Sequence, residues 1–304
     1  MTFKAFSSII LIAIAAARVA SASLTKRVLC PSGHLTANAA CCILFPISDD
    51  IQANLFDGGQ CVEEVHESLR LTFHDANGFS PTFDETQVFH ADDGIADILG
   101  AQEPFFLKFD DKLSAGDSIQ FAGAIGLSNC PGAPGLEFLL GRPTGRASAA
   151  SPRGLIPEPQ DNITTILQQF AEVGFTPAEA IALIASHTIA APHNVNESPA
   201  VRTPFDSTPG IFDTQIFIEM QSRGTLFPGA TGNLLGESRL QTEFRAAMSK
   251  MATIGHNRAA MVDCSDVIPV PKPVTMDDIE QACATSAFPV LTADLGPATS
   301  ALPV

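Results

Sequence analysis

Four polar side chains fall on one face of the segment 63–74 if that segment is helical. They follow one another at spacings of four, three and four residues, and they are Glu63, Glu67, Arg70 and His74. Residues three and four apart share a helix face. His74 is a base and Arg70 a fixed cation one turn away, a pair that suits proton transfer while negative charge develops nearby. The alternative is a solvated face with a Glu67–Arg70 ion pair and a passive histidine.

A helix over Glu63 to His74 must position these groups. The remaining surface of that helix carries apolar residues, namely Val65, Leu69 and Phe73, with Val62 just before it. Apolar residues at this spacing hold a helix against a core. We therefore expect the polar stripe to stand on a helix fixed by its apolar sides.

Further helices are expected along the chain. The predicted segments are Ser48 to Phe56, Ser114 to Ser128, a helix capped by Asp161 and running to Glu172 before Gly174, a helix from Thr176 to about Ala191, Phe212 to Ser222, and Gln241 to Ile254. Thr176, Pro177 and Glu179 form a capping box with proline in the first turn. The helix after it is apolar on nearly every side, so it should be buried. Strand signals are weak, which predicts a mainly α fold.

A second histidine and an oxygen-rich loop follow. His187 lies near the end of the helix that begins at Thr176, and a lone histidine there is more often a core residue. Asp206, Thr208 and Asp213 lie on a loop bounded by proline and glycine. On the residues alone, this loop is best read as a turn with ordinary carboxylates.

Composition points to secretion. The 304 residues carry a formal net charge of −16 and seven cysteines. Such acidity argues against nucleic acid or an anionic membrane as partner. Residues 1–22 read as a signal peptide, 23–27 as a propeptide ending in a dibasic site, and the mature chain is expected to begin at Val28. Two sequons, at Asn162 and Asn196, agree with secretion. An odd cysteine count leaves at least one cysteine without an internal partner.

The wording of several segments resembles one family. Arg70-Leu71-Thr72-Phe73-His74-Asp75 is similar to the distal haem helix of the secreted fungal haem peroxidases (manganese, lignin and versatile, with the versatile enzymes most similar), and Leu183-Ile184-Ala185-Ser186-His187-Thr188 to their proximal helix. Further matches, in the family's order, are Phe121-Ala122-Gly123-Ala124, Asn129-Cys130-Pro131-Gly132-Ala133-Pro134, Leu155-Ile156-Pro157-Glu158-Pro159, Pro204-Phe205-Asp206-Ser207-Thr208-Pro209 and Asp263-Cys264-Ser265-Asp266-Val267. The matches cover most of the chain from Cys30 onward. The resemblance implies a two-halved all-α domain over residues 28–304, with haem b between distal and proximal helices and a Pro-rich tail from about 265.

The resemblance also implies roles for single residues. His187 would be the axial iron ligand, with Phe205 beside the cofactor. His74 would move the proton of peroxide, Arg70 would stabilise negative charge, and Phe73 would pack over the haem. The family's carboxylate partner for the axial histidine corresponds to Glu243, which has one extra methylene.

Metal sites and disulfides are implied in the same way. A proximal calcium site would comprise Thr188, Asp206, Thr208, Asp213 and the Ile211 carbonyl, while Asp75 would remain from a distal calcium site. Glu63 and Glu67 match two Mn²⁺ ligands, and His193 stands at the third position. The implied disulfides are Cys30–Cys42, Cys41–Cys264 and Cys61–Cys130, with Cys283 left without its partner.

The sequence also departs from the family. Asp92 and Thr86 replace the asparagine and glutamate that orient the distal histidine, and a carboxylate there would raise the pKa of His74 and shift the peroxide reaction to higher pH. The calcium loop after Thr82 is deleted, although Asp84, Glu85, Asp92 or Asp93 could supply oxygens. A second deletion follows Thr242. These losses indicate either a degenerate enzyme or missed exons. The surface tryptophan of lignin-oxidising relatives aligns with Ala182, and the chain contains no Trp or Tyr.

The leading hypothesis is a secreted, monomeric haem peroxidase that reduces H₂O₂ with electrons from small phenols or Mn²⁺, with a role in lignin breakdown. The alternative is a degenerate relative that binds haem with impaired or no turnover. A third possibility is a secreted calcium-binding domain without haem, which would keep the proximal loop but leave His74 and Arg70 without a task.

Overall fold

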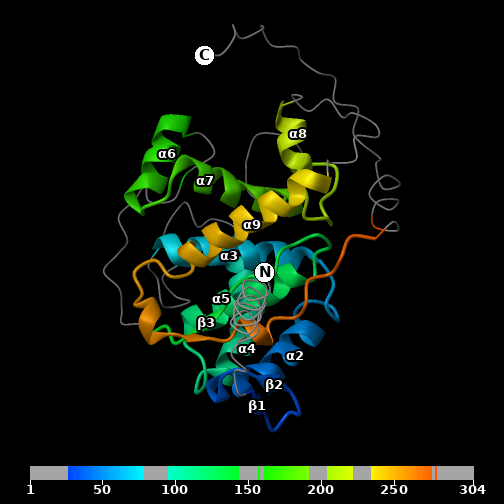
Figure 1. The fold of residues 1–304 in the computed structure, drawn as a ribbon, viewed down its shortest axis with the longest axis vertical. Helices are drawn as coiled ribbons and strands as arrows, with labels where there is room; N and C mark the ends of the chain where they lie inside the picture. The colour runs from blue at the N-terminus through cyan, green and yellow to red at the C-terminus, as the bar shows by residue number, and fades with distance from the viewer. Residues whose placement is uncertain are drawn as a thin grey trace, which may run out of the picture.

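Helices form almost all of the regular structure in the computed structural model of the chain (Figure 1). The structure describes residues 27–78, 95–143, 157, 161–191, 204–221, 234–275 and 278. Its α-helices are α2 (Leu44–Asn54), α3 (Glu63–Gly78), α4 (Ala96–Phe109), α5 (Ala115–Ser128), α6 (Ile163–Glu172), α7 (Pro177–Ile184), α8 (Gln215–Gln221) and α9 (Leu234–Met251). The prediction of a mainly α fold is confirmed.

Strands are confined to two short antiparallel pairs in the described part of the chain. Strand β1 (Val28–Leu29) pairs with β2 (Leu35–Thr36), and β3 (Leu139–Leu140) pairs with β4 (Val262–Asp263). Short 3₁₀ turns complete the elements: η1 (Ala39–Ile43), η4 (Ala185–Ile189), η5 (Arg258–Ala260) and η6 (Ser265–Val267). The second strand pair joins the middle of the chain to its C-terminal part.

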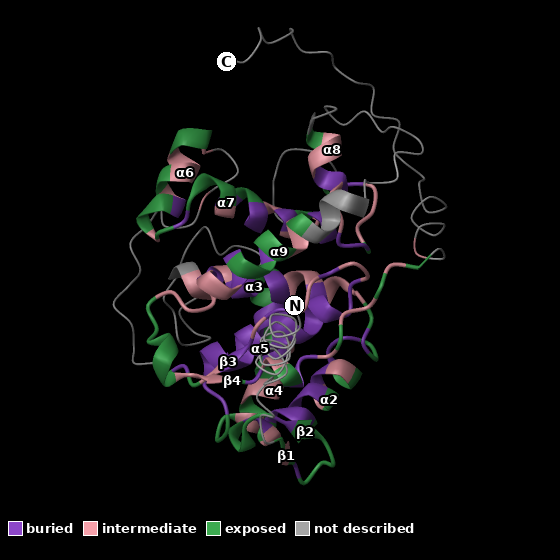
Figure 2. Cartoon of the chain, viewed as in Figure 1, coloured by how far each residue is buried: buried purple, intermediate pink, exposed green. Residues whose placement is uncertain are grey.

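Helix α5 is the centre of the fold. All fourteen of its residues are buried, and Figure 2 shows this as an almost unbroken buried segment. Ser114 caps its start, because the Ser114 hydroxyl accepts a hydrogen bond from the Asp117 amide at 3.1 Å. Helix α3 packs along α5 more extensively than any other described pair of elements. A helix buried on all sides fixes the position of whatever packs against it.

The pair α6 and α7 shows one cap as expected and one shifted by a residue. The capping box of Thr176 and Glu179 is confirmed, with the Thr176 amide donating to Glu179 Oε2 at 2.8 Å. The expectation that Asp161 caps α6 is wrong. The cap is Asn162, whose Oδ1 accepts from the Thr165 amide at 3.0 Å. Helix α6 ends before Gly174, which has a positive φ of 87°.

Helix α7 is less buried than its composition suggests. Ile181 is 54 % exposed, so the expectation of burial on nearly every side is wrong, and Figure 2 shows exposed residues along this helix. Ala182, aligned with a surface tryptophan of relatives, is only 2 % exposed. The helix also does not continue to Ala191, because it tightens at Ala185 into the 3₁₀ turn η4, which carries His187.

Several boundaries differ from expectation. Helix α2 begins at Leu44 rather than Ser48, α8 begins at Gln215 rather than Phe212, and α9 begins at Leu234 rather than Gln241. Helix α4 has no counterpart among the predicted helices. It contains Pro104 in its interior and has no side-chain hydrogen bond at its N-cap, Ile95. Both features remove the usual sequence signs of a helix.

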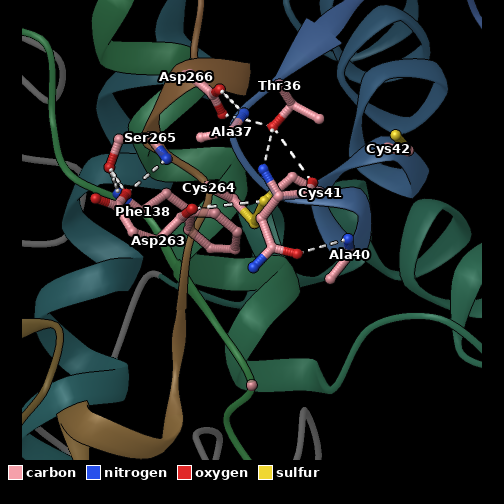
Figure 3. The surroundings of a disulfide bond; sticks show 12 residues. Thr36, Ala37, Ala40, Cys41, Cys42, Phe138, Asp263, Cys264, Ser265 and Asp266 are labelled. Atoms are coloured by element: carbon pink, nitrogen blue, oxygen red, sulfur yellow. Dashed lines mark hydrogen bonds between the residues drawn. A yellow bond between two sulfur atoms is a disulfide. The ribbon is translucent and has the colours of Figure 1, made fainter. Parts of the chain in front are cut away.

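The three expected disulfides are present, namely Cys30–Cys42, Cys41–Cys264 and Cys61–Cys130, and the second of them joins residues 223 positions apart in the chain. Figure 3 shows the surroundings of Cys41–Cys264. Beside that bond, Asp266 accepts hydrogen bonds from the Thr36 hydroxyl at 3.0 Å and from the Ala37 amide at 2.7 Å. The N-terminal strands are thereby held to the segment that follows β4.

That segment is not merely a tail over the surface, which corrects the expectation for residues after about 265. Val267 and Ile268 are buried in the core, and the Lys272 amide donates to the Ser128 carbonyl at 3.1 Å. The Gly132 amide donates in turn to the Lys272 carbonyl at 3.0 Å. The described part of the tail therefore packs on the end of α5. Within the described ranges, no helix combines the length and apolar character needed to cross a membrane.

Candidate active site

The distal pair lies on α3 as the spacing predicts. Arg70 Nε donates a hydrogen bond to His74 Nε2 at 3.2 Å, with His74 buried and Arg70 exposed. Since an arginine side chain only donates, Nε2 of His74 is an unprotonated acceptor and the ring proton is on Nδ1. The ring of Phe73 contacts that of Phe170 on α6, with the centroids of the two phenyl rings 6.1 Å apart. An unprotonated ring nitrogen beside a fixed cation is the arrangement that general base catalysis requires.

Helix α5 fixes this part of α3 at two points, neither of which was predicted. Gln120 Nε2 donates both to the Thr72 carbonyl at 3.1 Å and to Asp75 Oδ2 at 2.8 Å. One turn further along α5, Gly123 allows close approach, since a Cβ there would lie 2.2 Å from Thr72 Cγ2. Thr72 and Asp75 flank His74 in the sequence, so both contacts hold the catalytic turn of α3. We call these two contacts the α5 clamp.

Asp75, a half-buried residue, is held by the clamp. Burial raises its pKa to about 6, against the lowering effect of the Gln120 hydrogen bond. Asp75 was expected to remain from a distal calcium site. In the structure its carboxylate accepts a hydrogen bond from Gln120. The other residues proposed to supply oxygens to that site lie outside the described residues, namely Asp84, Glu85, Asp92 and Asp93.

His187 lies across from α3, on η4, and the two elements are in contact. The residue as a whole is accessible to solvent, but protein atoms surround its ring, which lies 5.1 Å from the ring of Phe205, centroid to centroid, at a tilt of 34°. Burial by the surrounding protein, and secondly the positive charge of Arg70, lower the pKa of His187. The distal cation therefore acts on the proximal histidine, and both effects favour its neutral form, the form that binds a metal. The structure brings the predicted distal and proximal residues to one region.

The expected carboxylate partner of His187 is not placed beside it. Glu243 is exposed, its side chain being 47 % accessible, and its Oε1 accepts from Arg239 Nε at 2.8 Å, one turn earlier on α9. Among the described residues, no carboxylate hydrogen-bonds to the His187 ring. The placement of Glu243 follows from its position on the outer face of α9, since the next residue, Phe244, occupies the buried face.

The predicted oxygen ligands on the proximal side converge. The Thr188 hydroxyl donates to Asp206 Oδ2 at 2.5 Å and lies 3.1 Å from Asp213 Oδ1, and the Thr208 hydroxyl donates to Asp213 Oδ2 at 2.9 Å. The loop is closed by the Ile211 amide, which donates to the Thr208 carbonyl at 2.9 Å. These are hard oxygen donors, the type that Ca²⁺ selects. We call Thr188, Asp206, Thr208 and Asp213 the proximal oxygen cluster.

The surroundings of both carboxylates in this cluster disfavour negative charge, so both pKa values are raised. Burial raises the pKa of Asp206 to about 7, and the charges of Asp213 and Glu219 add to this effect. Burial likewise raises the pKa of Asp213. Glu219, which sequence reasoning missed, accepts from the Ser207 amide at 3.0 Å and from Gln215 Nε2 at 2.8 Å, one turn earlier on α8. A divalent cation would supply the charge that these groups lack.

The two glutamates proposed for Mn²⁺ lie one turn apart on α3, both half-buried. Burial raises the pKa of Glu67 to about 7, and the negative charges of Glu63 and then Asp97 raise it further, while Arg70 opposes them. Asp97, in the first turn of α4, was not among the predicted residues. The proposed third ligand, His193, lies outside the described residues, as do Asp92, Thr86, Asn196 and Cys283.

Comparison with known proteins agrees with this geometry. The model of the peroxidase family matches residues 47–253, and that of the fungal peroxidase extension region matches residues 239–304. The chain therefore belongs to the peroxidase family, the haem-dependent oxidoreductases that act on peroxide.

Its relatives place it among the fungal enzymes. It is 46 % identical to manganese peroxidase 3 of Phlebia radiata, covering 97 % of this chain and 98 % of the relative. It is 46 % identical to versatile peroxidase VPS1 of Pleurotus eryngii and 41 % identical to ligninase H2 of Phanerodontia chrysosporium, each over 92 % of both chains. The alignment with the first spans 359 positions, more than the 304 residues of this chain, so it contains gaps in this chain.

The residues present fit the groups that the family implies. For haem, His187 offers an imidazole with a lowered pKa, and the charge of Arg70, which is hydrogen-bonded to His74, reaches that imidazole. For calcium, the proximal oxygen cluster offers two carboxylates and two hydroxyls from neighbouring positions.

Proposed function

We propose that this chain is a secreted, monomeric haem peroxidase that reduces H₂O₂ with electrons from small phenols or Mn²⁺, and that it acts in lignin breakdown. The observation that carries the proposal is the Arg70–His74 pair on α3, at 3.2 Å, together with the effect of the Arg70 charge on His187. Among its relatives, the name manganese peroxidase supports Mn²⁺ as an electron donor, and the name ligninase supports a role in lignin breakdown.

His74 and Arg70 divide the work on peroxide. His74 Nε2, which carries no proton, accepts a proton from the peroxide oxygen that will stay behind and delivers it to the leaving oxygen, which departs as water. The Arg70 guanidinium stabilises the negative charge on that leaving oxygen while the O–O bond breaks. Haem, held by His187 when bound, supplies the redox chemistry. Phe73 and Phe205 flank the site with apolar rings.

The proximal oxygen cluster holds the other side of the site. Thr188 follows His187 directly in the chain, so a Ca²⁺ ion bound by Thr188, Asp206, Thr208 and Asp213, with the Ile211 carbonyl, would fix the turn that carries the iron ligand. Asp75 is held by the α5 clamp instead, which makes a distal calcium ion unnecessary for its placement.

A second candidate function is a haem-binding relative without turnover. The placement of Glu243 favours it, because this carboxylate pairs with Arg239 on the outer face of α9. Without a carboxylate on the other ring nitrogen, an axial histidine is a weaker electron donor to iron.

The visible spectrum of the haem-loaded mature chain, before and after one equivalent of H₂O₂, tests the proposal. We expect a rapid spectral change in the wild type and a change slowed by at least about 100-fold in His74→Leu and in Arg70→Leu, the size typical of general acid–base catalysis. His34→Gln, which alters an exposed histidine in the turn between β1 and β2, should react like the wild type.

A wild-type spectrum that stays unchanged or bleaches slowly would support the second candidate. If the haem spectrum changes rapidly but His74→Leu is equally fast, the proposed role of α3 is wrong. Purification without any haem uptake would overturn both functions and leave a calcium-binding domain.

A further inference from the structure

The start of α6 carries a chemical signal that the peroxidase function does not use. Asn162-Ile163-Thr164 is a sequon, and all three residues are exposed, Ile163 to 66 %. Asn162 is also the N-cap of α6, with an extended backbone at φ −75° and ψ 158°. The sequon therefore begins outside the helix, on accessible chain at the surface.

The two polar atoms of the Asn162 amide have separate surroundings. Oδ1 accepts from the Thr165 amide at 3.0 Å, and this is the hydrogen bond that caps α6. Nδ2 makes no hydrogen bond to any described residue. Capping uses the oxygen, so the nitrogen remains available for chemistry that leaves the oxygen in place.

We propose that Asn162 is N-glycosylated and continues to cap α6 in that state. In the reaction, Nδ2 forms a bond to the anomeric carbon of an oligosaccharide carried on a lipid diphosphate. The bond from that carbon to the diphosphate oxygen breaks, and the lipid diphosphate leaves together with the proton lost from Nδ2. The product is a secondary amide whose oxygen can still accept from Thr165.

This geometry distinguishes three substitutions. Thr164→Ala destroys the sequon and leaves the capping residue unchanged. Asn162→Asp removes the nitrogen but keeps an oxygen that caps a helix equally well. Asn162→Ala removes both the modification and the cap. These substitutions therefore separate the effect of the glycan from the effect of the helix cap.

The proposal rests on secretion, which forms part of the proposed function, and the experiment reads the two separately. The chain is produced in a secreting yeast, and its peptides are examined by mass spectrometry before and after peptide N-glycosidase, which converts a glycosylated asparagine to aspartate. We expect the wild-type peptide that contains Asn162 only after treatment, with aspartate at position 162. In Thr164→Ala the same peptide should be seen untreated, with asparagine. Trypsin would leave both sequons on one peptide, residues 154–202, so the chain is digested with a protease that cleaves after glutamate. Cleavage at Glu172 and Glu179 places Asn162 and the other sequon, at Asn196, on separate peptides.

Sequencing the N-terminus of the same preparation separates the possible failures. An unmodified Asn162 on a chain that begins at Val28 overturns the glycan while leaving secretion intact. A chain that keeps Met1 overturns secretion and with it the glycan.

Thermal unfolding tests the double use of the side chain. Glycosylated wild type, Thr164→Ala and Asn162→Asp should retain the cap, whereas Asn162→Ala should melt at a lower temperature than all three. If the glycosylated wild type melts as low as Asn162→Ala, the modified side chain does not cap α6 and that part of the proposal is wrong.

Discussion

The two sides of the site are held in different ways. On the distal side, the α5 clamp contacts the turn of α3 around His74 through an uncharged amide donor, Gln120, and a close approach at Gly123. On the proximal side, the turn that carries His187 adjoins two carboxylates with raised pKa values, the buried Asp206 and the half-buried Asp213. We therefore expect the turn around His74 to be held by direct packing on α5, and the turn that carries His187 to depend more on a bound cation.

The largest loss of stability is expected when a side chain is added at Gly123, where α5 and α3 approach closely. In Gly123→Ala, the added Cβ would lie 2.2 Å from Thr72 Cγ2, a distance that forces α3 away from α5. Overpacking costs about 1–3 kcal/mol, and we expect the upper end, about 3 kcal/mol, because both helices are buried here. Urea unfolding with the disulfides intact measures this loss.

Gly100→Ala is the matched control for that substitution. Gly100 lies in α4, and a Cβ there would meet nothing within 4 Å. Alanine is favoured over glycine inside a helix by about 0.5–1 kcal/mol, so this variant should be slightly more stable than the wild type. Equal losses in both variants would mean that the contact with Thr72 does not determine how α3 packs.

The next effect is the gain in stability from calcium. At a Ca²⁺ concentration 100 times its dissociation constant, binding should stabilise the fold by about 2.7 kcal/mol. Asp206→Asn should abolish this gain. Asp75→Asn should leave it intact, because the clamp and not a metal ion holds Asp75. Thermal unfolding with Ca²⁺ or with a chelator measures both, and a gain lost in Asp75→Asn would contradict the contrast between the two sides.

The same experiment has a definite pH dependence. Burial raises the pKa of Asp206 from 3.8 to about 7, so the folded calcium-free protein holds this proton at pH values where the unfolded chain has lost it. The stability of the calcium-free form should therefore fall as pH rises from about 4 to about 7. Calcium should stabilise most above pH 7, where Asp206 is ionised before the metal binds. A calcium gain that shrinks above pH 7 would reverse this sign.

Local signals predicted well those features that depend on a few neighbouring residues. The stripe on α3 and the capping box at Thr176 each require only helical spacing over one or two turns, and both are present. The cap of α6 shows the precision of such signals. Asp161 and Asn162 are both good caps, and the sequence does not decide which of two adjacent residues leaves the helix first.

Features set by distant contacts could not be predicted in this way. Gln120 contacts Asp75 across 45 residues of sequence, and no periodicity marks that pairing. Glu243 was assigned from its distance to a family motif next to a deletion, but only the rotation of α9 decides whether it faces His187 or solvent. In the structure it pairs with Arg239. Helix α4 was missed because Pro104 argues against a helix interior, although the surrounding packing tolerates it.

A smaller loss is expected when the polar half of the α5 clamp is removed. Gln120→Leu deletes the donor to Asp75 and to the Thr72 carbonyl and leaves both acceptors buried, which should cost about 2 kcal/mol. The pKa of Asp75, now about 6, should rise further, so the loss should be greater at pH 8 than at pH 5. Gln168→Leu, an exposed position on α6, should stay within about 0.5 kcal/mol of the wild type. A loss that does not depend on pH would show that Gln120 acts through packing alone.

The smallest effect on the fold, and the most specific effect on function, is expected at Glu67. Burial, and then the negative charges of Glu63 and Asp97, raise the pKa of Glu67 to about 7. Negative charges therefore repel one another at the place where Mn²⁺ is proposed to bind. Glu67→Gln should weaken Mn²⁺ binding roughly tenfold or more while leaving phenol oxidation unchanged and stability within about 0.5 kcal/mol. In the wild type, Mn²⁺ should bind less tightly below pH 7, because the proton on Glu67 competes with the metal.

Glu172→Gln, at an exposed position on α6, should change none of these quantities. If Glu67→Gln instead lowers phenol and Mn²⁺ oxidation equally, Glu67 acts on the Arg70–His74 pair, and the negative charges on α3 belong to the distal side rather than to a separate metal site.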